Sequence, residues 1–251
     1  MTSNAIALDQ FVGTLDPAAT EIEMFGPSLH IETVDNAFGR PGTLLWRADI
    51  DVTHTDSRMG DPDIRVGQID FVMARTGVEG LADDLLDRSK FHGLRTDRFA
   101  PLFDDHRIGP ELAQQFSDPV EVVMFVLWGV IDPALRGHRL GAWALCQAIE
   151  TMMPTSNGLI LVHPHWDAEW EADPSVEQLE SVDRLNRYLM TAGLVPLQDR
   201  PQFLAQHANR HALQVAIASY QERFFGNDED YTMSTPIAPI RQRIDEGSDF
   251  L

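Results

Sequence analysis

Lysine is scarce in this sequence, and the shortage is part of a strong excess of negative charge. Lys90 is the only lysine among 19 basic residues, which stand against 39 acidic residues and give a formal net charge of −20. A surface of that sign repels nucleic acid and anionic membranes and attracts cations. The composition therefore predicts neither a nucleic-acid nor a membrane partner, and it fits either solubility alone or a cationic, amine-bearing substrate.

Cysteine and long apolar runs are scarce too. Cys146 is the only cysteine, so an internal disulfide is excluded, which suits a reducing compartment. No lysine or arginine precedes Arg40, so a secretory signal is not expected. The longest apolar run, Val122 to Ile131, has ten residues, whereas a bilayer-spanning helix needs roughly 20. These absences together predict a soluble, cytoplasmic protein.

The first part of the chain has the patterns of β-strands. Residues 43–53 alternate apolar and polar side chains, which is the period of a half-buried strand, and residues 64–75 give a second strand after a turn-rich connection. Together they predict an antiparallel hairpin, with shorter strands at 20–25 and 29–34. Three carboxylates of the early strands are interpreted either as solvent-facing residues or as ligands for a cationic substrate: Asp49, Asp51 and Asp70.

The second part alternates strands and helices. Residues 122–131 are too apolar for a strand with one wet face and predict a central strand covered on both sides. A helix with an apolar stripe is predicted from Leu140 to Met152, before Pro154. The elements predicted after it are a strand at 158–162, a helix at 175–193 with Leu179, Val182, Leu185 and Leu189 facing inward, a return to the sheet at 194–197, and a segment at 211–225 that periodicity leaves as helix or strand.

The order of these elements predicts the fold class. Strands come first, and then helices and strands alternate without a visible linker, which is typical of an α/β (α+β) protein. We expect a single domain over residues 1–251. Residues 226–251 are polar and proline-rich, and we expect them to form a loose tail.

One loop concentrates positive charge at the start of a predicted helix. The stretch "VIDPALRGHRLG", residues 130–141, leaves the central strand and enters the helix. A helix start leaves about four backbone N–H groups unpaired and carries partial positive charge, so an anion can bind there. Gly137 and Gly141 remove side chains that would block the backbone, and Arg136 and Arg139 add guanidinium groups that match phosphate oxygens. The loop is therefore either a pyrophosphate cradle or an ordinary strand–helix turn.

This loop resembles the signature loop of the GNAT superfamily, the acyl-CoA-dependent N-acetyltransferases. In that family an arginine or glutamine, two residues, a glycine, one residue, and a glycine or alanine follow a strand and open a helix. Arg136 and Gly141 match the first and last positions. Pro133 and Gly137 match frequent accompanying residues, and Arg139 stands where the family usually has glycine. The resemblance covers about residues 118 to 200.

The resemblance implies a fold and a cofactor. The fold would be a GNAT-like mixed, mostly antiparallel central sheet flanked by helices, with acetyl-CoA or another acyl-CoA at a splayed strand pair, Phe125–Ile131 and Leu159–His163. The pyrophosphate would lie on the N–H groups of the loop, and the pantetheine arm would pair like an added strand with the end of the central strand. The implied cofactor-binding residues are Gly129, Val130, Ile131, Arg136, Gly137, His138, Arg139, Leu140, Gly141 and Ala142.

The implied activity is an N-acyltransferase without a metal, in which an amine attacks the thioester carbonyl directly. The amine would belong to a small molecule or a protein. Holding a lysine-like amine neutral at pH 7 costs about 3.4 pKa units, or roughly 4.6 kcal/mol, so a base or a desolvating site is needed. His163 is the candidate base or water relay, Tyr188 the candidate acid, and Glu121 a further candidate at the start of the central strand. Each also fits an ordinary packed or solvated residue. The oligomeric state is open, with a homodimer as one form.

Two other functions are compatible with the sequence. His163, His165 and Asp167 follow an apolar strand at a spacing similar to the metal loop of metallo-β-lactamase-like hydrolases, and two imidazoles with a carboxylate can bind zinc. The other alternative is a catalytically inactive GNAT-like module that binds a ligand and acts in regulation or as a scaffold.

Overall fold

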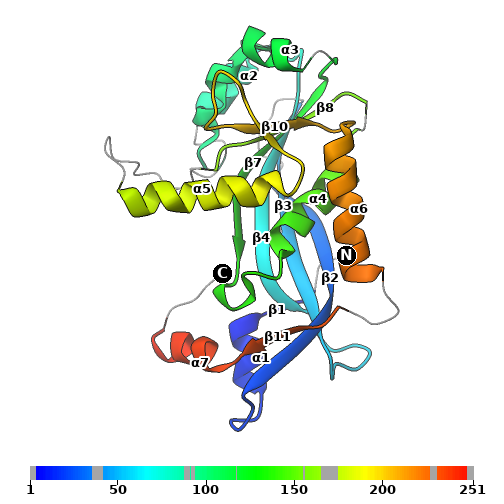
Figure 1. Ribbon diagram of the computed structural model, residues 1–251, viewed down its shortest axis with the longest axis vertical. Coiled ribbons are helices and arrows are strands. Elements are labelled where there is room, and N and C mark those ends of the chain that lie inside the picture. Colours follow the sequence, from blue (N-terminus) through cyan, green and yellow to red (C-terminus); the bar gives the residue numbers. More distant parts are fainter. Residues whose placement is uncertain are drawn as a thin grey trace.

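The computed structural model describes residues 4–35, 42–87, 91, 94–116, 118–154, 156–164, 175–226 and 231–247. A large sheet dominates this part of the chain (Figure 1). Its strands are β1 (Ile6–Ala7), β2 (Glu21–Asp35), β3 (Thr43–His54), β4 (Ile64–Arg75), β7 (Val122–Ile131), β8 (Gly158–Val162), β9 (Val195–Pro196), β10 (Leu204–His207) and β11 (Met233–Pro236). A separate small ribbon consists of β5 (Phe103–Asp104) and β6 (Arg107–Ile108).

The sheet is mixed and mostly antiparallel, as predicted. Its strand order is β11-β2-β3-β4-β7-β8-β10-β9, with β1 beside β4. Within the described residues, the parallel pairs are β7 with β8 and β1 with β4, and the other neighbours run antiparallel. The predicted hairpin of β3 and β4 is confirmed, with Trp46 opposite Phe71. β7 therefore joins the antiparallel half of the sheet to the part that follows the loop.

Helices cover both faces of the sheet, which confirms the predicted α/β (α+β) class. They are α1 (Leu8–Thr14), α2 (Leu81–Leu86), α3 (Pro110–Gln115), α4 (Leu140–Met152), α5 (Val176–Met190), α6 (His211–Phe225) and α7 (Ala238–Asp245), with short 3-10 turns η2 (Thr96–Arg98), η3 (Ala100–Leu102) and η4 (Pro133–Leu135). One apolar cluster joins one sheet face to α1, α4, α6 and α7, and a second joins the opposite face to α2, α3 and the turns η2 and η3. Figure 1 shows α2 and α3 at one end of the sheet and α1, α7 and β11 at the other.

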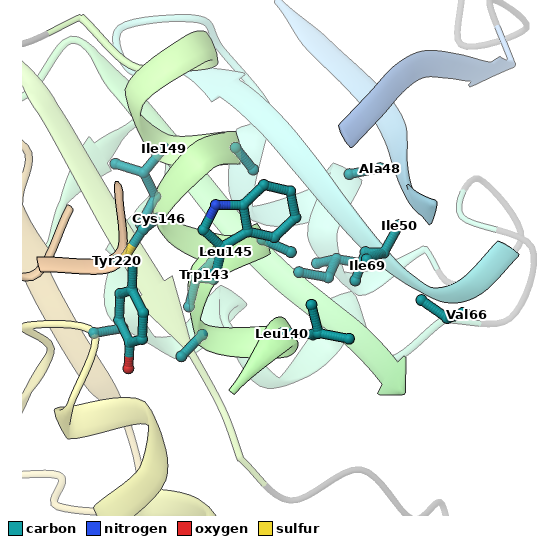
Figure 2. Packing of buried hydrophobic residues seen from close by; sticks show 14 of the residues in the cluster. Ala48, Ile50, Val66, Ile69, Leu140, Trp143, Leu145, Cys146, Ile149 and Tyr220 are labelled. Atoms are coloured by element: carbon teal, nitrogen blue, oxygen red, sulfur yellow. The ribbon is translucent and has the colours of Figure 1, made fainter. Parts of the chain in front are cut away.

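The helix α4 is the centre of the first cluster. Small and apolar residues repeat at helical spacing, so Leu140, Ala144 and Ala148 are all buried against the sheet. Figure 2 shows Trp143 and Leu145 of α4 beside Ile50 and Ile69 of the hairpin. Because the helix is buried at its first residue, its N-terminus is held in a fixed position at the end of β7.

Two predictions about local structure differ from the observed fold, and one assignment that the sequence left open is settled. The two short strands predicted around Gly26 form one strand, β2, because a register shift between Phe25 and Ser28 absorbs the break and Gly26 adopts a left-handed φ of 56°. In α5, Leu189 is buried, whereas Leu179 is half exposed rather than facing inward. The segment that periodicity left open is a helix, α6, with Leu213, Ile217 and Phe224 buried.

The C-terminal segment corrects the prediction of a loose tail. β11 pairs antiparallel with β2, and α7 follows it. Met233, Ile237 and Ile240 are buried in the first apolar cluster. A few well-placed apolar residues are enough to fix this segment, although its composition is polar. In the described ranges no helix is both long and apolar enough to cross a membrane.

Candidate functional site

The strand β7 changes its surroundings halfway along its length. Its first half pairs with β8, from Val122 opposite Gly158 to Val126 opposite Val162. On the other edge, β4 places Phe71 opposite Val126 but Asp70 opposite Trp128, so Leu127 is an extra residue and forms a β-bulge. Beyond the bulge, β7 pairs within the described chain with β4 alone. Its edge toward β8 is therefore available from residue 127 to residue 131.

A cavity of about 360 Å³ lies along this second half of β7. Residues from four parts of the chain line it: β4, β7, the loop with the start of α4, and the end of α5. They are Ile69, Val126, Gly129, Val130, Ile131, Leu135, Arg136, Gly137, Arg139, Leu140, Gly141, Leu145, Leu185, Tyr188 and Leu189. The interior is mainly apolar, and the two arginines belong to the loop. Of the ten residues predicted to bind the cofactor, only His138 and Ala142 are absent from the lining.

The loop turns sharply to bring its backbone to the cavity. The Asp132 carboxylate accepts the N–H of Ala134 at 2.9 Å and begins the η4 turn. Gly137 and Arg139 then adopt left-handed φ values of 96° and 67°. Such a conformation costs a non-glycine residue about 1–2 kcal/mol. The loop therefore stores strain at Arg139, directly before α4.

Backbone N–H groups accumulate where the loop meets the helix. Within the described chain, the five consecutive N–H groups of residues 137–141 have no hydrogen-bond partner. The next one, of Ala142, donates to Tyr188 Oη at 2.6 Å. Unpaired N–H groups at a helix start carry partial positive charge, and here Arg136 and Arg139 add full charges. In a chain of net charge −20 this is a local reversal suited to an anion.

Tyr188 is the polar group at the end of the cavity that α5 closes. A Cβ atom placed on Gly141 would lie 3.2 Å from Tyr188 Oη, so glycine at 141 leaves room for the hydroxyl. Burial raises the pKa of Tyr188 to about 12, although the hydrogen bond from Ala142 opposes this shift. The phenol is therefore protonated at neutral pH and can donate its proton in a hydrogen bond.

His138 points to a different neighbour. Its Nδ1 lies 3.4 Å from Tyr231 Oη, and the two rings meet edge to face. Burial lowers the pKa of His138, and the nearby Arg223 lowers it further. We therefore find His138 as a neutral support of the loop, while its backbone N–H remains in the unpaired series.

His163 and Glu121 do not line the cavity. His163 follows β8, with its ring edge-on to Phe203 and its Nδ1 3.3 Å from Arg98 Nη1, on the sheet face opposite α4. Guanidinium has only donors, so this contact makes Nδ1 an acceptor and leaves the proton of a neutral ring on Nε2. Glu121 is exposed before the first residue of β7, eight residues from Gly129 along an extended strand, or about 26 Å. The structure brings Tyr188 to the predicted cradle but not Glu121.

The three carboxylates of the early strands are buried, which corrects their interpretation as solvent-facing residues. Arg65 lies 2.7 Å from Asp49 and 3.2 Å from Asp51, and Arg47 forms a two-bonded pair with Asp70. Burial raises the pKa of Asp49, and Arg65 opposes the shift. Alternation alone missed this, because cross-strand arginines cover the polar side of the hairpin.

The predicted metal loop and the single cysteine add no further site among the described residues. His165 and Asp167 of the predicted metal loop lie outside the described residues. In the ranges that are described, no group of three or more His, Cys, Asp or Glu side chains is arranged to hold a metal ion. Cys146 is buried in α4, and burial raises the pKa of its thiol to about 12, as expected for a core thiol.

Sequence reasoning missed the apolar walls of the cavity. Ile69, Leu135 and Leu185 come from segments far apart in the sequence, and no local pattern links them. The spacing of Leu185, Tyr188 and Leu189 puts them on one helical face and could have indicated a shared surface. Comparison of the chain with protein-family models, with curated proteins and with solved structures finds no match.

Proposed function

We propose that the cavity binds an acyl-CoA and that the protein transfers its acyl group to an amine. The observation that carries this proposal is the series of five unpaired N–H groups at residues 137–141, beside an apolar cavity that runs along the available edge of β7. A diphosphate would lie on the N–H groups and the two arginines. An amide-containing arm would extend from there along residues 127–131.

The shape of the site supports a ligand with one anionic end and one less polar end. The loop supplies N–H donors and guanidinium groups, whereas the opposite walls are leucine, isoleucine and valine side chains. A free inorganic anion would use only the loop. The edge of β7 beyond the bulge offers backbone groups to a chain-like ligand, as strand addition requires. These features agree with the acyl-CoA that the resemblance to the GNAT superfamily implies.

The chemistry that we propose is direct transfer. The amine lone pair attacks the thioester carbonyl carbon, the carbon–sulfur bond breaks, and the thiolate leaves while the amine loses a proton to a base. Tyr188 is the group of this chain suited to the leaving sulfur. Full proton transfer from a phenol of pKa about 12 to a thiolate of ordinary pKa is uphill by about 3.5 units, so we infer that Tyr188 donates a hydrogen bond.

The role predicted for His163, a base or a water relay, stays a prediction. His163 does not line the cavity, so we assign it no role here and leave the base to water or to a neutral substrate amine. Glu121 has no part in this proposal.

A thermal shift measurement tests binding. At about one hundred times the Kd, a ligand stabilises by about 2.7 kcal/mol, which for a chain of this size raises Tm by about 5–10 °C. We expect acetyl-CoA and CoA to do so and inorganic pyrophosphate to do less. Arg136→Ala should weaken the shift, and Arg107→Ala, at an exposed arginine on β6, should leave it unchanged. Indifference of the wild-type protein to both CoA species would overturn the proposal.

A turnover assay distinguishes acyl transfer from the alternative in which the protein binds CoA without reaction. Release of free thiol from acetyl-CoA in the presence of a panel of primary amines indicates transfer. Tight CoA binding without amine-dependent thiol release across the panel would favour the inactive regulatory module.

A further inference from the structure

The C-terminal segment holds the outer side of the loop whose inner side faces the cavity. Three of its residues reach the loop from β11, α7 and the segment before them, and we call them the C-terminal clasp: Tyr231, Thr235 and Arg243. All three lie within residues 231–247, while the loop lies about one hundred positions earlier in the sequence. Figure 1 shows α7 and β11 beside α1 at one end of the sheet.

Arg243 makes the strongest of these contacts. Its Nη2 lies 2.8 Å from Asp132 Oδ2 and its Nη1 lies 3.2 Å from Asp132 Oδ1. The same guanidinium bonds to both oxygens of Asp9 in α1. Asp132 is buried and also begins the η4 turn by accepting the Ala134 N–H. One arginine thus joins the N-terminal helix α1, the C-terminal helix α7 and the first residue after β7.

The other two residues hold the loop further along. Thr235 is buried and donates its hydroxyl to the carbonyl of Ala134 at 2.7 Å. Tyr231 packs against His138, and its hydroxyl accepts a bond from Arg223 Nη2 at 2.8 Å. The clasp therefore contacts the loop at residues 132, 134 and 138, on both sides of Arg136.

Such support has a physical reason. A loop with five unpaired N–H groups and a left-handed arginine would gain hydrogen bonds by collapsing or by extending the helix. The clasp bonds use side chains and a carbonyl of the loop, so they leave the N–H groups available. A loop held ready in this way loses less entropy when an anion binds.

We propose that Arg243 is a positioning residue of the cofactor site and that the C-terminal clasp keeps the loop in its ligand-binding shape. This inference rests on the proposed binding of CoA. It adds that α7, which does not line the cavity, sets the affinity of the site through Asp132.

Arg241 offers a matched control on the same helix. Its guanidinium bonds to the carbonyls of Asp16, Pro17 and Ala19 in the turn before β2, with no contact to the loop. Arg241→Ala and Arg243→Ala should both loosen α7. Only Arg243→Ala should weaken CoA binding, by about tenfold relative to Arg241→Ala, within the usual range of couplings between sites. Arg243→Lys should recover part of the loss, because it restores the charge without the two-bonded fork.

The measurement is calorimetric titration of each folded variant with CoA, well below its melting temperature. Equal affinity in Arg243→Ala and Arg241→Ala would overturn the inference while leaving CoA binding intact. If the wild-type protein does not bind CoA, the proposed function fails instead. Hydrogen exchange of the hydrogen-bonded amides of residues 134–136 and 142 without ligand then still decides the positioning role, since it should be faster in Arg243→Ala than in Arg241→Ala.

A second pair of variants covers the case in which Arg243→Ala does not fold. Thr235→Val keeps the size of the side chain and removes its bond to the Ala134 carbonyl, so CoA affinity should fall several-fold. Ser234→Ala, the neighbouring residue in β11, removes a surface bond to Glu21 and should leave affinity unchanged. Equal affinity in this pair would also count against the clasp.

Discussion

The two halves of β7 are both largely apolar but have different surroundings. Residues 122–126 pair with strands on both edges, and their side chains fill both apolar clusters, as Phe125 does against Phe99 and Phe103. Within the described chain, residues 127–131 pair on one edge only, and Gly129, Val130 and Ile131 line the cavity together with Val126 at the end of the first half. A single extra residue, Leu127, separates the halves. At this bulge the strand changes from pairing on both edges to pairing on one edge within the described chain, while it remains apolar.

The two halves are expected to contribute differently, the first to stability and the second to the proposed binding of CoA. In the first half, side chains such as that of Phe125 stabilise the fold by filling the core. In the second half, Gly129 has no side chain and so leaves space in the cavity. A Cβ atom at Gly129 would meet only ordinary contacts, 3.6 Å from Ile69 Cγ1 and 3.8 Å from the Gln68 carbonyl. The backbone there tolerates a side chain, so a substitution would act on the cavity more than on the fold.

The largest expected effects come from one substitution in each half of β7. Phe125→Ala should cost about 3–5 kcal/mol of unfolding free energy, because it empties a fully buried aromatic site. Gly129→Leu should change stability by about 1 kcal/mol or less and abolish the thermal shift caused by CoA. Urea unfolding measures the first effect and thermal shift the second.

The control for this pair is the folded fraction of each variant. Phe125→Ala that is still folded should bind CoA normally, since Phe125 is absent from the cavity lining. If Gly129→Leu binds CoA like the wild-type protein, the second half of β7 is not the binding edge, and the contrast between the halves has no functional meaning.

A smaller effect is expected at Tyr188, where the cavity meets α5. Tyr188→Phe leaves the Ala142 N–H without its partner and should cost about 1–2 kcal/mol near neutral pH. The folded pKa of about 12 lies above the ordinary value of about 10. Between those values the unfolded chain loses the phenolic proton first, so the stability that Tyr188 contributes is lost as pH rises.

Urea unfolding at pH 9 and pH 11 measures this effect. The stability difference between wild type and Tyr188→Phe should shrink by about 1 kcal/mol from the lower to the higher pH. A difference independent of pH would mean that the hydroxyl is well solvated and does not close the cavity.

The parts of the fold that local patterns specify were predictable from the sequence. The alternation of β3 and β4, the apolar run of β7 and the stripe of α4 give elements with the predicted type and position. β10 was not predicted, because Leu204 to His207 is short and half polar. It is a strand because the free edge of β8 pairs with it, and Gln206 and His207 are buried with hydrogen bonds to Gly193 and Pro119.

The candidate site also has parts that a local motif predicted and parts that no local pattern could predict. The loop glycines and arginines were found from a local motif, and they do line the cavity. The C-terminal clasp could not be found, since the sequence does not show which of its residues reach Asp132 and Ala134. Glu121 lies before the start of β7, at the end away from the cavity, and periodicity does not say which end of a strand borders a cavity.

The smallest predicted effect concerns Arg139, the strained residue directly before α4. Arg139 has a φ of 67°, which costs about 1–2 kcal/mol in a non-glycine residue, while glycine adds about 0.5–1 kcal/mol of unfolded-state entropy. Arg139→Gly should therefore stabilise the fold by about 0.5–1 kcal/mol in urea unfolding. Arg136→Gly, at an ordinary φ of −63°, should destabilise it by about the same amount. Loss of stability in Arg139→Gly would mean that contacts of the arginine side chain offset the strain of its backbone.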